Sequence, residues 1–164
     1  MLQISRRADY AVRIMLELAS RPEGERISSA ELAARTEVPR SFLHKIVADL
    51  AKAGLVRTYK GPNGGLMLVR SPSEINMQHI LEAVDGPVCL NACLLRPSEC
   101  PRDVMCPAHR FWGRLQAMVI AELQAATLEK LVAEGEQLRQ DPGQGGIVYV
   151  LQIMENDADG ESPS

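Results

Sequence analysis

Four side chains that bind soft metals stand close together in the second half of the 164-residue chain. They follow the pattern Cys93-x6-Cys100-x5-Cys106-x2-His109, and a further cysteine, Cys89, lies four residues before the first. Thiolates together with an imidazole favour iron–sulfur clusters, zinc or copper(I). Structural zinc sites usually hold the metal with short clips, and this segment has no C-x-x-C pair. The spacing therefore suits an iron–sulfur cluster at least as well as zinc.

The cysteines lie in residues 88–107, a proline-containing stretch of about twenty residues in which we expect a loop. Loops longer than about 12–15 residues are uncommon in compact domains unless they are functional. A ligand that ties the loop down would explain its length. One alternative needs no metal and oxidises a thiol pair, with Cys89 and Cys93 as candidates. Another is that two of the cysteines are small buried hydrophobic residues.

The first 70 residues carry the pattern of a winged helix-turn-helix. Apolar residues at helical intervals predict helices, Gly54 ends the third of them, and two strand-like runs flank a glycine-rich turn. Helix, short helix, tight turn, helix and hairpin is the order of that motif. The predicted fold is therefore mainly α with a small β-hairpin wing. The expected helices cover residues 8–19, 31–35 and 39–53, and the expected strands cover 55–60 and 66–70.

In such a fold the third helix enters the DNA major groove and the wing reaches the backbone or the minor groove. The alternatives are a solvated helix face with an ordinary hairpin, or a winged helix that binds protein. The candidate DNA-binding residues are Arg40, Ser41, His44 and Lys45 on the helix, and Lys60, Gly61 and Asn63 at the wing.

Charge is divided unevenly along the chain. The whole sequence has 18 Lys and Arg against 21 Asp and Glu, a net charge of −3 that argues against nucleic-acid binding. Residues 1–70 hold 12 Lys and Arg against 7 Asp and Glu, a net of +5, which leaves −8 for residues 71–164. This asymmetry indicates a basic DNA-binding half and an acidic second half.

We expect four segments: a winged helix-turn-helix domain over 1–87, a cysteine-rich cluster loop over 88–107, a dimerisation helix over 108–140, and a C-terminal extension with an acidic tail over 141–164. A helix over 71–85 closes the first segment, with Ser71 at its start. The long helix carries an apolar stripe suited to packing against a second copy, so the chain is expected to be a homodimer. Thr127 is expected to cap a last turn or two that contains Leu128, Leu131 and Val132. Ile147–Met154 is expected to form a strand or a short helix.

Several other classes of protein are not expected. The chain has no G-x-S-x-G elbow, P-loop or G-x-G-x-x-G motif, so we expect no enzyme. Its longest apolar run, Ile147–Leu151, is far shorter than the about 20 residues of a membrane span. A cytoplasmic protein without membrane contact is therefore expected, where thiols stay reduced.

Five stretches of the chain carry a further signal: Ile4–Arg13, Gly61–Gly65 after Lys60, Glu82–Pro87, the cysteine loop and Ala126–Leu131. Together they closely resemble the IscR/NsrR family of bacterial, dimeric winged-helix transcription regulators, which sense iron–sulfur status, nitric oxide, iron or redox state. The resemblance covers about residues 1–135.

The resemblance implies that Cys93, Cys100 and Cys106 bind a 2Fe–2S or 4Fe–4S cluster. A fourth ligand in that family is either a histidine three residues past the last cysteine, where His109 stands, or an aspartate from the partner's first helix, where Asp9 stands. His109 is favoured because a local ligand closes the loop within one chain. Two features depart from the family pattern: the first gap is six residues where the best-known members have five, and Cys89 is an additional thiol and possible ligand.

The sequence thus predicts a dimeric repressor that binds a near-palindromic operator in double-stranded DNA and senses iron–sulfur status, nitric oxide or redox state through its cluster. The alternatives are a zinc-stapled interaction module and a metal-free, thiol-based redox regulator of the same fold.

Overall fold

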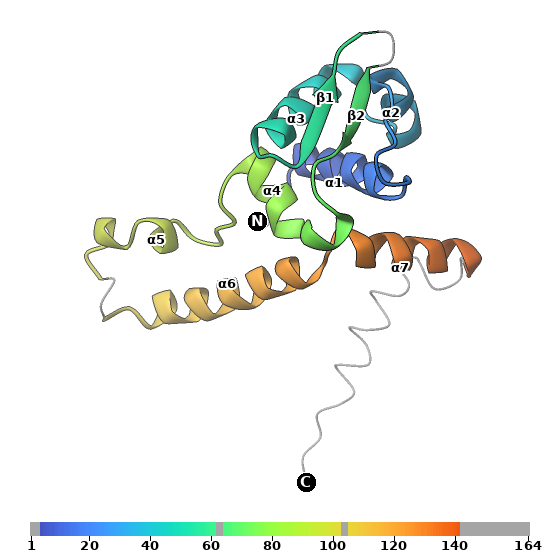
Figure 1. Cartoon of the computed structure of the whole chain (residues 1–164). Coiled ribbons are helices and arrows are strands. Elements are labelled where there is room, and N and C mark those ends of the chain that lie inside the picture. The colour runs from blue at the N-terminus through green and yellow to red at the C-terminus, as the bar shows by residue number, and fades with distance from the viewer. Residues whose placement is uncertain (1–3, 62–63, 103–104, 142–164) are drawn as a thin grey trace.

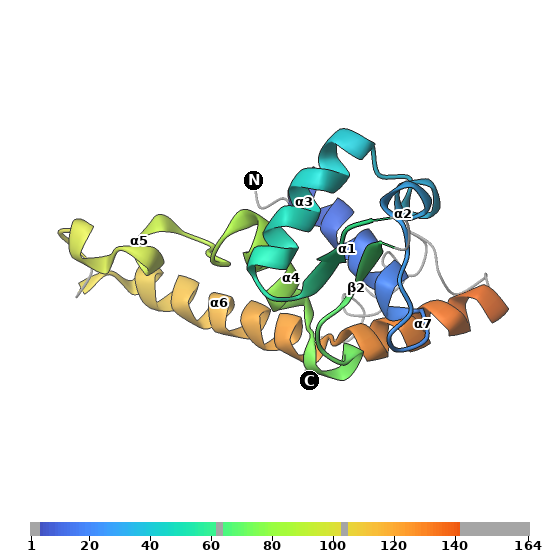
Figure 2. The same ribbon diagram turned by 45° about the horizontal axis from the view of Figure 1, so that its top comes forward.

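A computed structural model describes residues 4–61, 64–102 and 105–141 of the chain. It consists of a winged helix-turn-helix body from which two helices extend in opposite directions (Figure 1, Figure 2). The elements are α1 (Arg6–Ala19), α2 (Ser29–Thr36), α3 (Arg40–Lys52), β1 (Val56–Tyr59), β2 (Gly65–Leu68), the 3-10 turn η1 (Pro72–Glu74), α4 (Met77–Asp85), α5 (Ala92–Leu95), the 3-10 turn η2 (Pro97–Glu99), α6 (Pro107–Ala125) and α7 (Leu128–Gln140).

The core of the body forms around α1, which packs against α2, α3, α4 and α7. Its buried face includes Ile14 and Met15, both fully enclosed, and their neighbours from the other helices are equally inaccessible. The helix begins two residues earlier than its apolar period predicts, because the Ser5 side chain accepts a hydrogen bond from the Ala8 N–H at 3.0 Å. The predicted mainly helical fold with a hairpin wing is confirmed.

Local capping explains where the helix-turn-helix elements begin and end. Ser28 and Glu31 have the spacing of a capping box, and the Ser28 hydroxyl accepts a hydrogen bond from the Glu31 N–H at 3.1 Å. The Glu31 carboxylate instead accepts from Arg21 at 2.9 Å. Gly54 has the left-handed conformation (φ 71°) expected after α3.

Arg21 joins three acidic side chains at the end of α1. Burial alone would lower the pKa of its guanidinium, but the hydrogen bond to Glu31 and the charges of Glu31, Glu25 and Glu17 together raise that pKa above its ordinary value. Glu17 also pairs with Arg35 from α2. These contacts fix α1 relative to α2.

The wing is an antiparallel pair in which Val56 lies opposite Leu68 and Tyr59 opposite Gly65. Ile27 adds a backbone bridge to Leu66 on the outer side of β2. Glycine is required at the returning strand, because a Cβ on Gly65 would lie 2.8 Å from the Ile27 carbonyl oxygen. The two strands thus rest against the segment that leads into α2.

Three predicted details need correction, and two of them lie between residues 71 and 107. The helix expected from Ser71 is interrupted: η1 ends at Glu74, Ile75 is extended, and Asn76 caps a separate helix, α4. Residues 88–107 are not free of structure, because they contain α5 and η2.

The helix expected over residues 108–140 is divided into α6 and α7. Thr127 caps α7, and Leu128 is buried in the core of the winged helix-turn-helix body. The α7 half of this range therefore packs on α1 and η1.

The junction between α6 and α7 is bonded to the start of α4. The Met77 N–H donates to the Ala126 carbonyl at 3.0 Å, and the Leu128 N–H donates to the Ile75 carbonyl at 2.8 Å. Asn76 and Thr127 therefore face each other in an isolated antiparallel bridge.

Within the described residues no helix combines the length and apolarity needed to cross a bilayer. The segment Ile147–Met154 lies outside the described residues.

Candidate functional site

One candidate site is the surface formed by α3 and the wing. Arg40, Ser41, His44 and Lys45 are all exposed on the first two turns of α3. The buried positions of the same helix, Leu43, Ile46, Val47 and Leu50, form the opposite face, so packing of the core orients the polar residues outward.

The electrostatics of this surface favour an anion. The single acidic residue of α3, Asp49, pairs with Arg7 of α1. Arg40, Lys45 and Lys52 then give the exposed side of the helix a positive charge. Phosphate contacts of DNA-binding proteins rely on such side chains.

The wing adds further positive charge beside α3. Lys60 and Gly61 are exposed at the end of β1, whereas Asn63 lies outside the described residues. The Arg26 guanidinium stacks over the Tyr59 ring at 3.6 Å from its centroid. Arg57 is exposed on β1. Arg26 and Arg57 are absent from the sequence-based set, although the strand pattern around Arg57 could have identified an outward-facing cation.

A groove of about 540 Å³ separates α3 from the wing. His44 lines it from α3, Thr58 and Tyr59 from the wing, and Ser28 and Ser29 from the start of α2. The serines are also absent from the predicted set, although the capping pattern marks a helix N-terminus, where backbone N–H groups favour phosphate.

The second candidate site lies at the far end of α6, where α5 packs against that helix (Figure 1). Cys93 is in α5, Cys100 follows η2, and Cys106 immediately precedes α6, which has His109 in its first turn. All of these side chains are half-buried. None of the four cysteines, all of which lie in the described residues, forms a disulfide, and this includes Cys89.

Hydrogen bonds and packing hold this segment on α6. The Leu90 N–H donates to the Gln116 side chain at 3.1 Å. Leu94 lies against Gly113, because a Cβ added to that glycine would be 3.9 Å from a methyl carbon of Leu94. The Cys89 thiol donates to the Asn91 carbonyl at 2.9 Å. The structure therefore gathers the predicted ligand set around the start of one helix.

These residues are not drawn into coordination contact. Among the described residues, no group of three or more His, Cys, Asp or Glu side chains is close enough to hold a metal ion. Asp9, the alternative fourth ligand, is exposed on α1 and pairs with Arg13 at 2.9 Å.

Most of the chain matches a known family. Residues 4–134 match the family Rrf2, described as iron-dependent transcriptional regulator. The chain belongs to the Rrf2 family. Its members are transcriptional regulators, so this chain is a winged-helix transcriptional regulator and not an enzyme.

Individual Rrf2-type relatives support the same conclusion. The regulator IscR of Vibrio atlanticus is 30% identical over 144 residues, which cover 85% of this chain and 83% of the relative. NsrR of Shouchella clausii is 31% identical over 141 residues, which cover 84% and 93%. The structure of CymR, the global cysteine regulator of B. subtilis, has a TM-score of 0.68 at 30% identity and covers 82% of this chain and 98% of CymR.

Proposed function

We propose that the chain is a homodimeric repressor that binds a near-palindromic operator and changes its DNA affinity when an iron–sulfur cluster is gained, lost or oxidised. The observation that carries this proposal is that one helix, α6, has the thiols and His109 at its start and is bonded to the winged helix at its end. Relatives named IscR and NsrR support it.

DNA is bound in this proposal by Arg40, Ser41, His44 and Lys45 from α3. Lys60, Gly61 and Asn63 of the wing contact the backbone or the minor groove. Two such units related by a dyad contact half-sites about 34–36 Å apart or a multiple of that distance.

The dimer in this proposal forms through α6. None of the 19 residues of α6 is buried in the single chain. Phe111 is 50% exposed and Met118 is 67% exposed, so the helix leaves large apolar side chains in water. Large apolar patches of this kind mark interaction surfaces.

The cluster is held in this proposal by Cys93, Cys100, Cys106 and His109, as a 2Fe–2S or 4Fe–4S centre. The residues fit such a group because soft thiol donors and an imidazole are half-buried around one helix start. The N-terminus of α6, beside Cys106, also favours negative charge. When bound, the cluster supplies a centre that reacts with oxidants and nitric oxide.

Asp9 from the partner subunit is the alternative fourth ligand, and Cys89 is an additional thiol near the set. If the same residues bind zinc, the chain is a zinc-stapled interaction module instead. If the thiols bind no metal and are oxidised, it is a thiol-based redox regulator of the same fold.

The visible absorption spectrum of protein purified without oxygen tests the cofactor. A brown protein with charge-transfer bands and bound iron and sulfide is expected. A colourless protein that contains zinc would contradict the cluster and indicate a structural zinc site in its place. A colourless, metal-free protein with a disulfide in its intact mass would indicate a thiol sensor.

DNA binding is tested by salt-dependent affinity for the operator. Arg40→Ala and Lys60→Ala are each expected to weaken binding and to lower the magnitude of the slope of log K against log salt by about 2, because each substitution removes one phosphate contact from each protomer of the dimer. The matched control is Arg96→Ala, an exposed cation between α5 and η2 that pairs with Glu99 and lies outside the winged helix and α6. Wild-type affinity in both test variants would contradict the assigned interface.

A further inference from the structure

Phe42 is a large apolar side chain on the surface proposed to bind DNA. It is the third residue of α3, and it is 42% exposed. Within α3, all of which the structure describes, the other large apolar side chains are buried in the core. Packing of the core therefore accounts for those residues but not for the exposed part of the Phe42 ring.

The ring borders the exposed basic side of α3. Phe42, Lys45 and Asp49 follow one another at intervals of three and four residues, so they form one row along the helix. Ser41, also exposed, precedes Lys45 by one turn. Residues at the N-terminal end of a recognition helix are the ones that reach base edges in the major groove. The exposed part of Phe42 therefore lies beside side chains that are candidates for base contacts.

Two contacts hold this side of α3 on α1. The Tyr10 ring of α1 meets the Phe42 ring edge to face, with 5.6 Å between the ring centroids and an interplanar angle of 74°. Arg7 of α1 pairs with Asp49. The Arg13 guanidinium lies over the Tyr10 ring, 5.7 Å from its centroid. The Phe42 ring is thus held in place by the protein itself.

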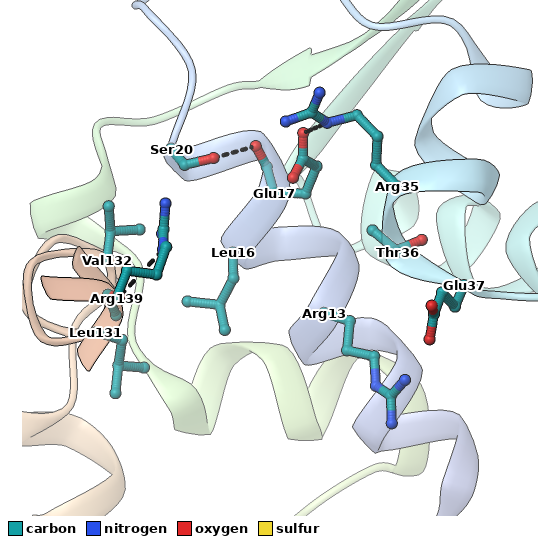
Figure 3. Close-up of a pocket in the computed structure, with 11 residues that line it drawn as sticks. Arg13, Leu16, Glu17, Ser20, Arg35, Thr36, Glu37, Leu131, Val132 and Arg139 are labelled. Atoms are coloured by element: carbon teal, nitrogen blue, oxygen red, sulfur yellow. Dashed lines mark hydrogen bonds and ion pairs between the residues drawn. The ribbon is translucent and has the colours of Figure 1, made fainter. Parts of the chain in front are cut away.

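The supporting helix α1 is also fixed within the body. Figure 3 shows Arg35 of α2 reaching Glu17 of α1, and the dashed line marks their ion pair. The inner side of α1 is fully enclosed at Ile14 and Met15. A ring on such a support loses little conformational freedom when it meets a ligand, and that loss is a main cost of binding. Phe42 is therefore preorganised for a contact on its exposed edge.

A phenyl ring limits the groups of duplex DNA that Phe42 can contact. The ring has no hydrogen-bond donor or acceptor for a phosphate, and proteins that stack rings on bases do so with single strands. The major groove presents one apolar group, the C5-methyl of thymine, and Phe is among the side chains that contact it. Cytosine presents no methyl group there, so such a contact distinguishes the two pyrimidines.

We propose that Phe42 contacts the C5-methyl group of a thymine in each operator half-site. The inference rests on the proposed docking of α3 in the major groove, and it adds an apolar base contact to the polar and charged ones assigned there. Phe42 is in this proposal a residue that determines sequence specificity, because it favours thymine over cytosine at one position of the half-site.

Operators in which deoxyuridine replaces thymidine test this contact, because uracil pairs like thymine and lacks only its methyl group. In an operator defined by footprinting, thymines are replaced at one position at a time, symmetrically in both half-sites, and the affinity is measured at fixed salt. At one position the wild-type protein is expected to bind about fourfold more weakly per methyl group, or about fifteenfold for the pair. Phe42→Ala is expected to bind the two operators with equal affinity.

The controls separate loss of the methyl contact from loosening of α3. The ratio of the two affinities is measured on one variant at a time, so a general weakening of Phe42→Ala cancels in that ratio. Phe42→Leu keeps an apolar side chain and is expected to retain part of the preference for thymine. Lys45→Ala, the matched control in the same row, is expected to weaken binding to both operators equally and to keep the wild-type preference.

Salt-dependent operator binding that no uracil substitution weakens would overturn this proposal and leave the proposed function standing. A preference for thymine that Phe42→Ala retains would also overturn it, because another side chain then contacts the methyl group. If that variant keeps the preference but changes its oligomeric state, the exposed ring contacts a second copy of the chain instead. A protein without sequence-specific DNA affinity would overturn both this inference and the proposed function.

Discussion

Asn76 and Thr127 each cap a helix with the side chain and pair with each other through the backbone. The Asn76 carboxamide oxygen accepts from the His79 N–H at 3.0 Å, and the Thr127 hydroxyl accepts from the Lys130 N–H at 3.3 Å. Their antiparallel bridge attaches α6 and α7 to the winged helix. A helix start on each side of one bridge therefore joins the α6–α7 junction to the start of α4 in the winged helix-turn-helix body.

Thr127→Ala and Asn76→Ala test this junction. Each is expected to lower the free energy of unfolding by about 1 kcal/mol, the usual cost of losing an N-cap. The double variant is expected to deviate from additivity by at least about 0.5 kcal/mol, because both caps support one bridge. Urea unfolding at a fixed protein concentration measures this, with Thr58→Ala on the exposed wing as the control. Strict additivity would show that the two caps act separately.

Gly65→Ala tests the closeness of the wing to the segment before α2. The new methyl group would press on the Ile27 carbonyl, so the wing must shift and operator affinity is expected to fall several-fold. Gly135→Ala is the matched control in α7, where the nearest atom to a Cβ is the end of Arg139 at 3.8 Å. That change is expected to add about 0.5–1 kcal/mol of stability without altering DNA affinity. Equal DNA affinity in both variants would contradict the role of the wing.

Glu37 is the one non-glycine residue with positive φ among the described residues, at φ 55° in the turn of the helix-turn-helix. A left-handed conformation costs a residue with a Cβ about 1–2 kcal/mol, and a glycine avoids this cost. The greater conformational entropy that glycine loses on folding offsets about 0.5–1 kcal/mol of the gain. Glu37→Gly is therefore expected to raise the urea midpoint. Glu37→Ala keeps the unfavourable conformation and serves as the control, so equal midpoints would rule out backbone strain.

Met118→Glu places a charge on the exposed stripe of α6. If α6 is the dimer interface, this variant is expected to sediment as a monomer at concentrations where the wild type is a dimer. Leu138→Glu on α7 makes the same change at another exposed apolar residue, 43% accessible, and is expected to leave the dimer intact. A dimeric Met118→Glu protein would move the interface elsewhere.

The fourth cluster ligand is tested by two alanine variants. If His109 is the ligand, His109→Ala is expected to alter the visible spectrum of the anaerobic protein, whereas Asp9→Ala removes only an exposed ion pair of less than about 1 kcal/mol. The opposite outcome, with the spectrum changed in Asp9→Ala alone, would assign the ligand to the partner subunit.

Local patterns in the sequence predict most of the winged helix-turn-helix. Ser28, Gly54 and the glycines of the wing act on neighbouring residues, so their effects can be predicted without tertiary structure. The exposed polar side of α3 follows from the same periodicity that defines its buried side.

The cap at Thr127 is confirmed, but the separation of α6 from a full second helix, α7, could not be predicted in the same way. Apolar residues continue through Ala126, and the break depends on hydrogen bonds to Ile75 and Met77, about fifty residues earlier. Likewise, α5 has four residues and is too short to show a periodic pattern. The spacing of the cysteines predicts the ligand set, but the packing of α5 on α6, which positions Cys93 relative to the start of α6, depends on tertiary contacts.

The length of α6 limits how a change among the cysteines reaches DNA. Nineteen residues at about 1.5 Å each make α6 about 28 Å long, and the bridge between Asn76 and Thr127 lies at its C-terminal end. A displacement of about 1 Å at the N-terminal end of α6, beside Cys106, would rotate the helix by only about 2°. In the proposed dimer, two α6 helices packed side by side would convert such a rotation into a change in the distance between the two α3 helices, so the half-site spacing would depend on both α6 helices together.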